Sequence, residues 1–277
     1  MTPVGSDEED LTRRERREQA RSNRKAAEQA AAAAASRRRR MTQLAGAVAI
    51  VVVAIVAILI ATGGGKSKPP TPGSPAAKNT PPEVQKEIGG IPQNGNTLGS
   101  PAAPVTLVYF GDLQCPICKE FTLGALPGVI EKWVKPGKLK IEYRNLETAT
   151  REPETFRTQQ TAALAAGAQH KMWDYLEIFY RQQGAEGSGY VNEAFLQGIA
   201  QQVPGLNLSK WASDRSNKAY ESQLEKDRES ASNEGFNGTP SFLLGKNGAL
   251  NKLEGSEYGS LTSSTGFDTS IEKALKS

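Results

Sequence analysis

The sequence has very few of the residues that usually build metal centres. Its 277 residues include one histidine, three methionines and two cysteines. A closed zinc site needs four ligands, and only His170 is available to join the two cysteines. The methionines, at positions 1, 41 and 172, are too scattered to form a copper-binding cluster with it. A resident metal is therefore the less favoured interpretation, and no cofactor is expected.

The two cysteines lie together in one C-x-x-C, Cys115-Pro116-Ile117-Cys118. A disulfide between them would close a loop of only four residues, which gives little entropic stabilisation. An apolar segment at 105–110 precedes them and has the composition of a strand. Pro116 is tolerated at the first position of a helix, so the sequence predicts strand, short loop, C-x-x-C and helix. This placement favours a redox-active dithiol over a structural cross-link.

The net positive charge of the sequence is confined to its first 40 residues. They contain eleven Lys and Arg against seven Asp and Glu, which accounts for the whole net charge of +4. Residues 41–277 balance to zero, so the pattern argues against a basic nucleic-acid-binding domain. The stretch 13–36 is rich in Arg, Glu and Ala and predicts a solvated helix or disorder. No nucleic-acid partner is expected.

One apolar run is long enough to cross a membrane. Residues 44–62 carry no charge, and at ~1.5 Å per residue they span roughly 28 Å. This run is longer than the apolar core of a cleaved signal peptide, which is the alternative. Four arginines at 37–40 precede it, whereas only Lys66 and Lys68 follow closely. The positive-inside rule then predicts a cytoplasmic tail over 1–40, a transmembrane helix over 41–62 that is retained as a signal-anchor, and an extracytoplasmic remainder.

The remainder divides into a linker and one domain. Residues 63–87 are rich in Pro and Gly and are expected to form a partly extended linker that cannot pack. Residues 88–277 are numerous enough for one domain with a sizeable core. A helix is expected from 115 to about 135 with a kink near Pro127, and a final helix over 269–276. Strands are expected at 105–110, 139–146, 241–244 and 249–253, and several helices between 154 and 234.

Three features together resemble the DsbA-like branch of the thioredoxin superfamily. They are the segment from Tyr109 to Cys118 (YFGDLQCPIC), a helical stretch over about 150–235 and the sequence Gly-Thr-Pro-Ser-Phe at 238–242 before a hairpin. The likeness covers roughly 88–277 and is more specific than the C-x-x-C alone. It implies an α/β thioredoxin-like fold with a helical insertion, preceded here by one transmembrane helix.

The resemblance also assigns chemical roles. Disulfide exchange requires a thiolate, which the N-terminus of a helix stabilises. By resemblance, Cys115 is the exposed attacking sulfur and Cys118 the shielded resolving sulfur. The Thr239–Pro240 bond is expected to be cis and to lie beside the dithiol, with the Thr239 backbone binding an extended substrate. The expected catalytic residues are therefore Cys115, Cys118, Pro240 and Thr239.

Two positions depart from the family pattern. The best-known oxidases have a histidine between the cysteines, where this chain has Pro116-Ile117. A buried acid six residues before the first cysteine is common in the superfamily, and Tyr109 occupies this position. A water, Asp112 or Glu142 could substitute for the acid, but both carboxylates are expected to lie at the surface.

The functional expectation is an extracytoplasmic thiol–disulfide oxidoreductase that forms disulfides in exported proteins. Its expected partners are unfolded or reduced exported proteins, a redox partner that reoxidises the dithiol, and the membrane through residues 41–62. Two alternatives remain open. One is a disulfide reductase or isomerase of the same fold, and the other is a non-catalytic, membrane-tethered adaptor with a structural disulfide.

Overall fold

The computed structural model describes residues 75–277. The expected tail over 1–40, the expected transmembrane helix over 41–62 and the first part of the expected linker, 63–74, lie outside these residues. None of the helices between residues 75 and 277 combines the length and the apolar character needed to cross a membrane.

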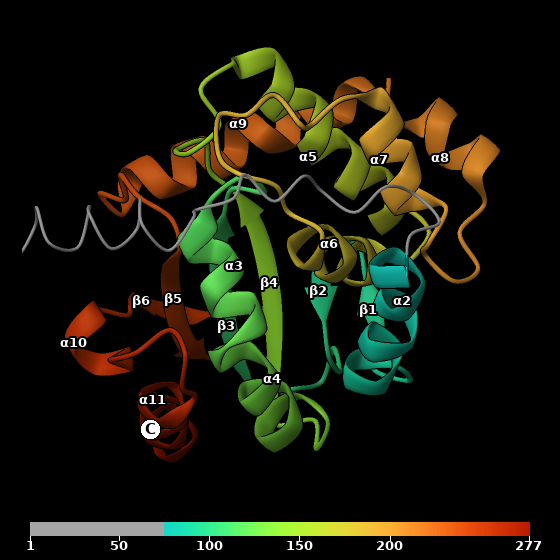
Figure 1. Cartoon of the computed structure of the whole chain (residues 1–277). Helices are drawn as coiled ribbons and strands as arrows, with labels where there is room; N and C mark the ends of the chain where they lie inside the picture. Colours follow the sequence, from blue (N-terminus) through green and yellow to red (C-terminus); the bar gives the residue numbers. More distant parts are fainter. Residues whose placement is uncertain (1–74) are drawn as a thin grey trace, which may run out of the picture. The chain divides into compact units, whose positions relative to one another are not determined.

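A six-stranded sheet forms the centre of the domain (Figure 1). Its strand order is β1-β2-β4-β3-β5-β6. β3 and β4 are parallel and are joined by a helical crossover, whereas every other neighbouring pair is antiparallel. The strands are β1 (Gln93–Asn94), β2 (Thr97–Leu98), β3 (Val105–Gly111), β4 (Leu139–Asn145), β5 (Ser241–Lys246) and β6 (Ala249–Lys252).

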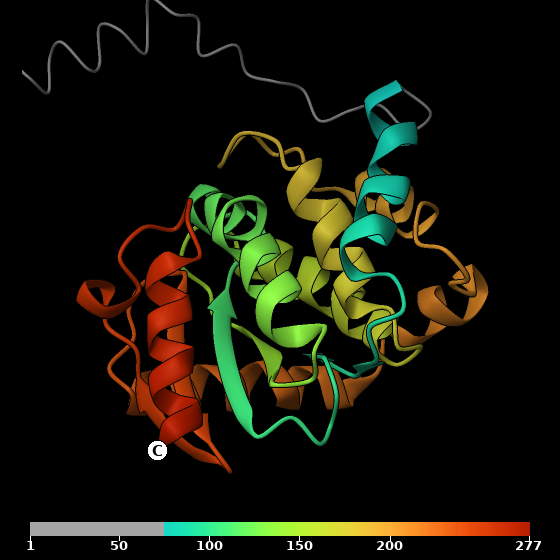
Figure 2. The same cartoon turned by 90° about the horizontal axis from the view of Figure 1, so that it is seen from below.

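Helices cover both faces of this sheet. α3, α4 and α11 lie on one face and α9 lies across the other (Figure 2). The helices are α2 (Pro75–Ile88), α3 (Pro116–Leu123), α4 (Ala125–Val129), the π-helical turn η1 (Ile130–Val134), α5 (Pro153–Gly167), α6 (Met172–Arg181), α7 (Glu193–Ala200), α8 (Leu208–Asp214), α9 (Lys218–Asn233), α10 (Gly255–Tyr258) and α11 (Thr265–Lys276).

The central strand β3 is buried along its whole length because both of its faces are covered. Leu107 and Tyr109 point into the larger core with the two cysteines, while Val108 and Phe110 pack against Ala231 of α9 in a smaller core. A strand that is covered on both faces has a nearly continuous apolar sequence, and residues 105–110 have this pattern. The two cysteines follow in the sequence directly after the carboxyl end of β3.

The expected strands and the helical insertion are confirmed. The insertion consists of α5–α9 and separates β4 from the β5–β6 hairpin, within the expected 150–235. The helix expected to kink near Pro127 is instead interrupted at Gly124. A side chain at Gly124 would lie 2.7 Å from the Leu261 carbonyl, and that carbonyl accepts the Ala125 N–H at 2.9 Å. The β1–β2 hairpin and α10 were not predicted, because such short elements carry no periodic pattern.

The expectation of an unpacked linker over 63–87 is wrong for its C-terminal part. Residues 75–88 form α2, in which Val84 and Ile88 are almost completely buried. Their spacing of four residues places both on one face of a helix. Gln85 of α2 also donates to the carboxylate of Asp174 in α6. The folded domain therefore begins before residue 88, and the proline content of this segment concealed a short amphipathic helix.

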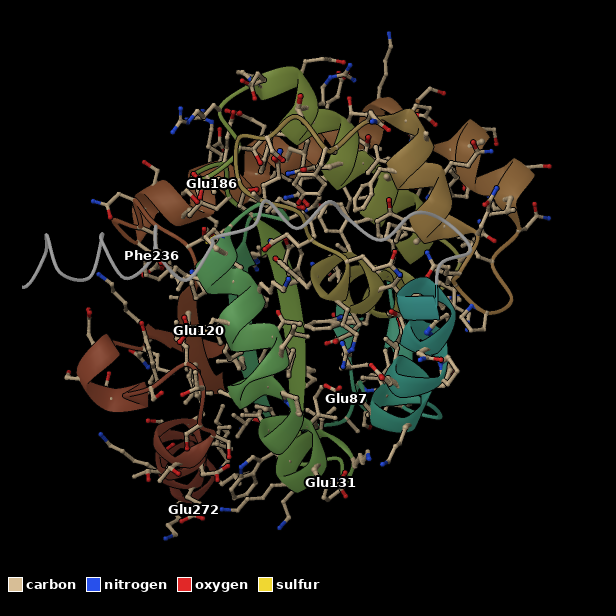
Figure 3. All side chains as sticks on the ribbon, viewed as in Figure 1. Glu87, Glu120, Glu131, Glu186, Phe236 and Glu272 are labelled. Atoms are coloured by element: carbon tan, nitrogen blue, oxygen red, sulfur yellow. The ribbon has the colours of Figure 1, made fainter. Side chains whose placement is uncertain are left out.

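A buried ionic cluster attaches α2 to α6. Glu87 lies on the inner side of α2 (Figure 3), and its carboxylate and that of Glu177 both pair with the guanidinium of Arg181. Glu177 is completely buried, whereas Glu87 and Arg181 each expose 14% of their side chains. Burial raises the pKa of Glu177 to about 8, and the charge of Glu87 adds to the rise against the attraction of Arg181. One guanidinium cannot neutralise two carboxylates that have lost their hydration.

Stability should therefore decrease as pH rises. The pKa of Glu177 in the folded chain lies above its ordinary 4.5, so its contribution is complete below about 4.5 and is lost as pH approaches about 8. We expect Glu177→Gln to flatten this slope and to raise the free energy of unfolding at pH 8 by about 1–3 kcal/mol relative to the unsubstituted chain. Denaturant unfolding of the disulfide form, in which the cysteines do not titrate, measures this effect. The exposed Glu272→Gln is the control, and identical slopes for all three chains would contradict the assignment.

Candidate active site

The two cysteines occupy the first turn of α3. Cys115 is the N-cap residue, with φ −71° and ψ 119°, and Pro116 follows at the first helical position. The Cys115 Sγ accepts the backbone N–H of Cys118 at 3.3 Å. A side chain at this position normally satisfies one of the free N–H groups of the helix. Here the group that does so is a sulfur, so the N-terminus of α3 stabilises negative charge on Cys115.

The two cysteine residues differ in exposure by less than expected. Cys118 is completely buried, as a shielded sulfur should be, but Cys115 is itself only 5% exposed. The expectation of an openly exposed attacking sulfur is therefore wrong in degree. Ile117 between them is 45% exposed and presents an apolar side chain beside the dithiol. A reacting thiol must therefore reach a largely buried cysteine beside this apolar side chain.

The segment before β5 completes the surroundings of the dithiol. The Thr239–Pro240 peptide bond is cis, as expected. The Cys115 thiol donates to the Thr239 carbonyl at 3.3 Å, so residues 124 positions apart in the sequence meet here. The Thr239 and Thr148 hydroxyls are hydrogen-bonded at 2.5 Å. The structure thus places Thr239 in contact with Cys115, with Pro240 beside it.

Hydrogen bonds set the two thiol pKa values apart. The pKa of Cys115 is lowered from 9.0 to about 6, chiefly by a hydrogen bond from Cys118, while partial burial opposes this and the Thr239 side chain and N–H groups of α3 assist. The Thr239 carbonyl has the opposite preference, because as an acceptor it binds only the protonated thiol. The pKa of Cys118 is raised well above 9.0, first by burial and then by its hydrogen bond to Cys115 and the charge there. Cys115 is therefore the thiolate at neutral pH.

Asp112 is not the surface carboxylate that the sequence suggested. It is completely buried, and its two oxygens accept six hydrogen bonds. The donors are the N–H groups of Gln114, Thr148, Ala149 and Thr150, the Thr150 hydroxyl and the Gln159 amide. A buried carboxylate needs such partners to offset the loss of its hydration. Asp112 therefore fixes the loop that carries Thr148 against the loop that leads to Cys115.

Glu142, the other carboxylate considered as a substitute for the buried acid, lies on the other face of the sheet, and the position of the acid is occupied by Tyr109. Glu142 is half-buried on β4 and pairs with Arg144, whereas the neighbouring Tyr143 points into the core that holds the cysteines. Successive strand residues face opposite sides of a sheet, so Glu142 is excluded from that core. Tyr109 is buried there and donates to the Tyr180 hydroxyl at 3.2 Å. Burial and then the nearby Cys118 raise the pKa of Tyr109 well above its ordinary 10.0.

Two residues near the dithiol had no signal in the sequence. Thr148 contacts Thr239 as described, and Gln183 donates its amide to the backbone of the loop before α3. Both belong to segments outside the C-x-x-C and the Thr-Pro motif. Between residues 75 and 277, no three side chains of His, Cys, Asp or Glu are grouped so that they could hold a metal ion. His170 is exposed and follows the end of α5.

The chain is similar to known proteins in sequence and in structure. A family model described as Thioredoxin matches residues 93–258. The disulfide bond formation protein D of Bacillus subtilis is 26% identical over 165 residues, 58% of this chain and 70% of that protein. The probable disulfide bond formation protein D of Bacillus anthracis is 24% identical over 152 residues, 54% of this chain and 70% of that protein.

Solved structures share the fold. Oxidised BdbD from Bacillus subtilis aligns with a TM-score of 0.55 at 22% identity, covering 68% of this chain and 98% of that one. Alpha-DsbA1 from Wolbachia pipientis aligns with a TM-score of 0.53 at 19% identity, covering 65% and 90% respectively.

The fold and the paired cysteines define an enzyme class, the protein thiol–disulfide oxidoreductases. The family match extends over more than half of the chain. The chain therefore belongs to the thioredoxin family.

The different ionisation of the two thiols can be measured directly. With a pKa of about 6, Cys115 should be mostly thiolate at pH 7, and its alkylation rate should level off above that pH. Cys118 should remain unreactive until much higher pH because burial raises its pKa. Alkylation rates and thiolate ultraviolet absorbance between pH 4 and 10 test this in the reduced chain, with Cys115→Ser and Cys118→Ser as the matched pair. An apparent pKa near 9 in Cys118→Ser would require that the Cys118 thiol itself, and not the helix N-terminus, stabilises the thiolate.

Proposed function

We propose that this protein is an oxidase that forms disulfides in exported proteins at Cys115-Pro116-Ile117-Cys118. The observation that supports the direction is the lowered pKa of Cys115 beside the raised pKa of Cys118. A stabilised thiolate lowers the free energy of the reduced form, and this makes the disulfide form a stronger oxidant. The absence of a histidine between the cysteines does not remove this effect, since the hydrogen bond from the Cys118 thiol is its largest source and the Thr239 side chain and the N–H groups of α3 assist.

The reaction consists of two exchanges. A substrate thiolate attacks the Cys115 sulfur of the enzyme disulfide, the S–S bond breaks, and its electron pair leaves on Cys118, which binds a proton because its pKa is high. A second substrate thiolate then attacks the substrate sulfur of this mixed disulfide and releases Cys115 as a thiolate. The substrate is oxidised by two electrons and the enzyme dithiol is reduced. The low pKa of Cys115 makes it the better leaving group in the second exchange.

The environment of the dithiol suits an extended, unfolded substrate. The Thr239 backbone lies beside Cys115, and the exposed Ile117 offers apolar contact next to the reacting sulfur. The disulfide bond formation proteins D to which this chain is similar support the same direction. A partner that accepts two electrons must restore the disulfide after each cycle, because the enzyme holds only these two cysteines.

Thiol loss in a reduced substrate tests the proposal. The oxidised full chain in detergent, mixed with a reduced, unfolded protein, should consume substrate thiols in proportion to enzyme disulfide. Cys115→Ser should abolish the reaction, and Cys118→Ser, which has no disulfide to exchange, should also consume no substrate thiols. Mixed instead with a disulfide-bonded substrate, the Cys115 thiolate of Cys118→Ser should attack that disulfide, release one substrate thiolate and remain in a mixed disulfide that no second cysteine resolves. A glutathione equilibrium that favours the enzyme disulfide would indicate a reductase, refolding of a scrambled substrate without net oxidation would indicate an isomerase, and no exchange would indicate an adaptor.

We also propose that residues 41–62 anchor the protein with its tail, 1–40, in the cytoplasm and its catalytic domain outside. The uncharged run at 44–62 and the arginines at 37–40 support this orientation. In bacterial cells the full chain should resist carbonate extraction from membranes, and protease added to spheroplasts should remove a C-terminal epitope but not an N-terminal one. Deletion of 41–62 should release the chain from the membrane. Extraction of the intact chain by carbonate would refute the anchor.

A further inference from the structure

We propose that Gln183, just after α6 in the helical insertion, is a positioning residue that holds the dithiol loop in the geometry that stabilises the Cys115 thiolate. The proposal rests on disulfide exchange at Cys115. It gives the insertion, which also covers the sheet and binds Asp112, a role at the reactive cysteine.

Gln183 binds the loop at two points. Its side-chain amide nitrogen donates to the Leu113 carbonyl at 2.8 Å and to the Cys115 carbonyl at 3.1 Å. The side chain is buried, with 7% of the residue exposed, so these bonds form away from competing water. An amide group has two N–H donors, which matches the two carbonyls. In return, the Lys119 ammonium of α3 donates to the Gln183 carbonyl at 3.4 Å.

The second of these bonds acts on the N-cap residue itself. The Cys115 carbonyl already accepts the Lys119 N–H at 3.2 Å, the first backbone bond of α3. Gln183 occupies the remaining acceptor position of the same oxygen. With its carbonyl held twice, Cys115 keeps the backbone angles that direct Sγ toward the N–H of Cys118. This direction is the one that favours the thiolate.

A neighbouring residue of α6 holds the start of the same loop. The Tyr180 hydroxyl donates to the Asp112 carbonyl at 3.2 Å. Tyr180 and Gln183 thus bind three of the four carbonyls from Asp112 to Cys115, all from one end of α6. On the opposite side, the Asp112 carboxylate is fixed by the loop at 148–150. Gln183 is the member of this arrangement that contacts the reactive cysteine.

The effect of Gln183 should differ between the two redox states. In the disulfide form the bond to Cys118 holds the Cys115 sulfur covalently, so the loss of an amide contact changes little. In the dithiol form no covalent bond holds it, and the thiolate depends on the position of the N-cap backbone. Removal of the amide should therefore destabilise the reduced form selectively. The protein should become a weaker oxidant with a higher pKa at Cys115.

The chain offers a matched control in the preceding residue. Gln182 is also buried, at 2% exposure, but its side chain pairs with Gln202 and with no residue of the dithiol loop. Gln183→Met and Gln182→Met remove the same amide at adjacent positions and keep similar volume. Both variants are compared with the unsubstituted full chain in detergent. The readouts are the Cys115 thiolate titration, the equilibrium constant for reduction by glutathione, and thermal stability.

For Gln183→Met we expect the reduction equilibrium constant to fall about three- to tenfold, and the Cys115 thiolate titration to move to higher pH by a corresponding amount. For Gln182→Met we expect both quantities to stay within about twofold of the unsubstituted chain. If both variants lose thermal stability alike and neither changes the titration or the equilibrium, Gln183 only packs the core and the proposal is wrong.

A second variant keeps the test decisive if Gln183→Met does not fold. Gln183→Asn retains the amide but is one methylene shorter, so it cannot reach both carbonyls and should show the same direction of change. An unchanged titration in Gln183→Asn would overturn the proposal. Failure of the oxidase activity itself would be distinguishable, because the titration of Cys115 does not depend on any substrate.

Discussion

The approach of Cys118 to the Cys115 sulfur, through its thiol and through its backbone N–H at 3.3 Å, is the contact on which the chemistry of this protein depends. It exists because Cys115 is the N-cap of α3 and because the chain enters this helix from the buried end of β3. The same short turn that exposes free N–H groups to Cys115 carries Cys118 into the core, where burial disfavours its ionisation. One helix end therefore separates the two thiols into a thiolate and a protonated thiol.

The rest of the domain can be understood as support for that turn. The Asp112 carboxylate binds the loop at 148–150 on one side, and the end of α6 binds the backbone of 112–115 on the other. Thr239 reaches Cys115 from a third segment. Few of these contacts involve flexible surface side chains, so the geometry is set before a substrate arrives. Preorganised polar groups of this kind act without reorganisation during the reaction.

Much of the fold was accessible from local patterns. The strands at 105–110 and 139–146 and the helices between 154 and 234 were predicted from apolar periodicity. The helical insertion as such and the cis Thr239–Pro240 bond were predicted from the family resemblance. The predictions were wrong where the composition of a segment suggested one structure and its packing in the folded domain produced another. The proline-rich segment that became α2 is helical because Val84 and Ile88 find a core to enter, and the buried Asp112 is tolerated because six donors converge on it. A short stretch of sequence shows neither the core surface against which a helix will pack nor the distant hydrogen-bond donors that will surround a carboxylate.

By itself, the sequence determined which chemistry is available, since its two cysteines share one C-x-x-C after an apolar strand. It also determined that a helix would begin there, because Pro116 suits the first helical position. Only the tertiary structure decided the environment of the thiols: the near-burial of Cys115, the contact with Thr239, and the amide of Gln183 on the loop. These contacts join residues from 68 to 124 positions apart, and such pairs are selected by the packing of whole elements against one another, not by their neighbours in the chain.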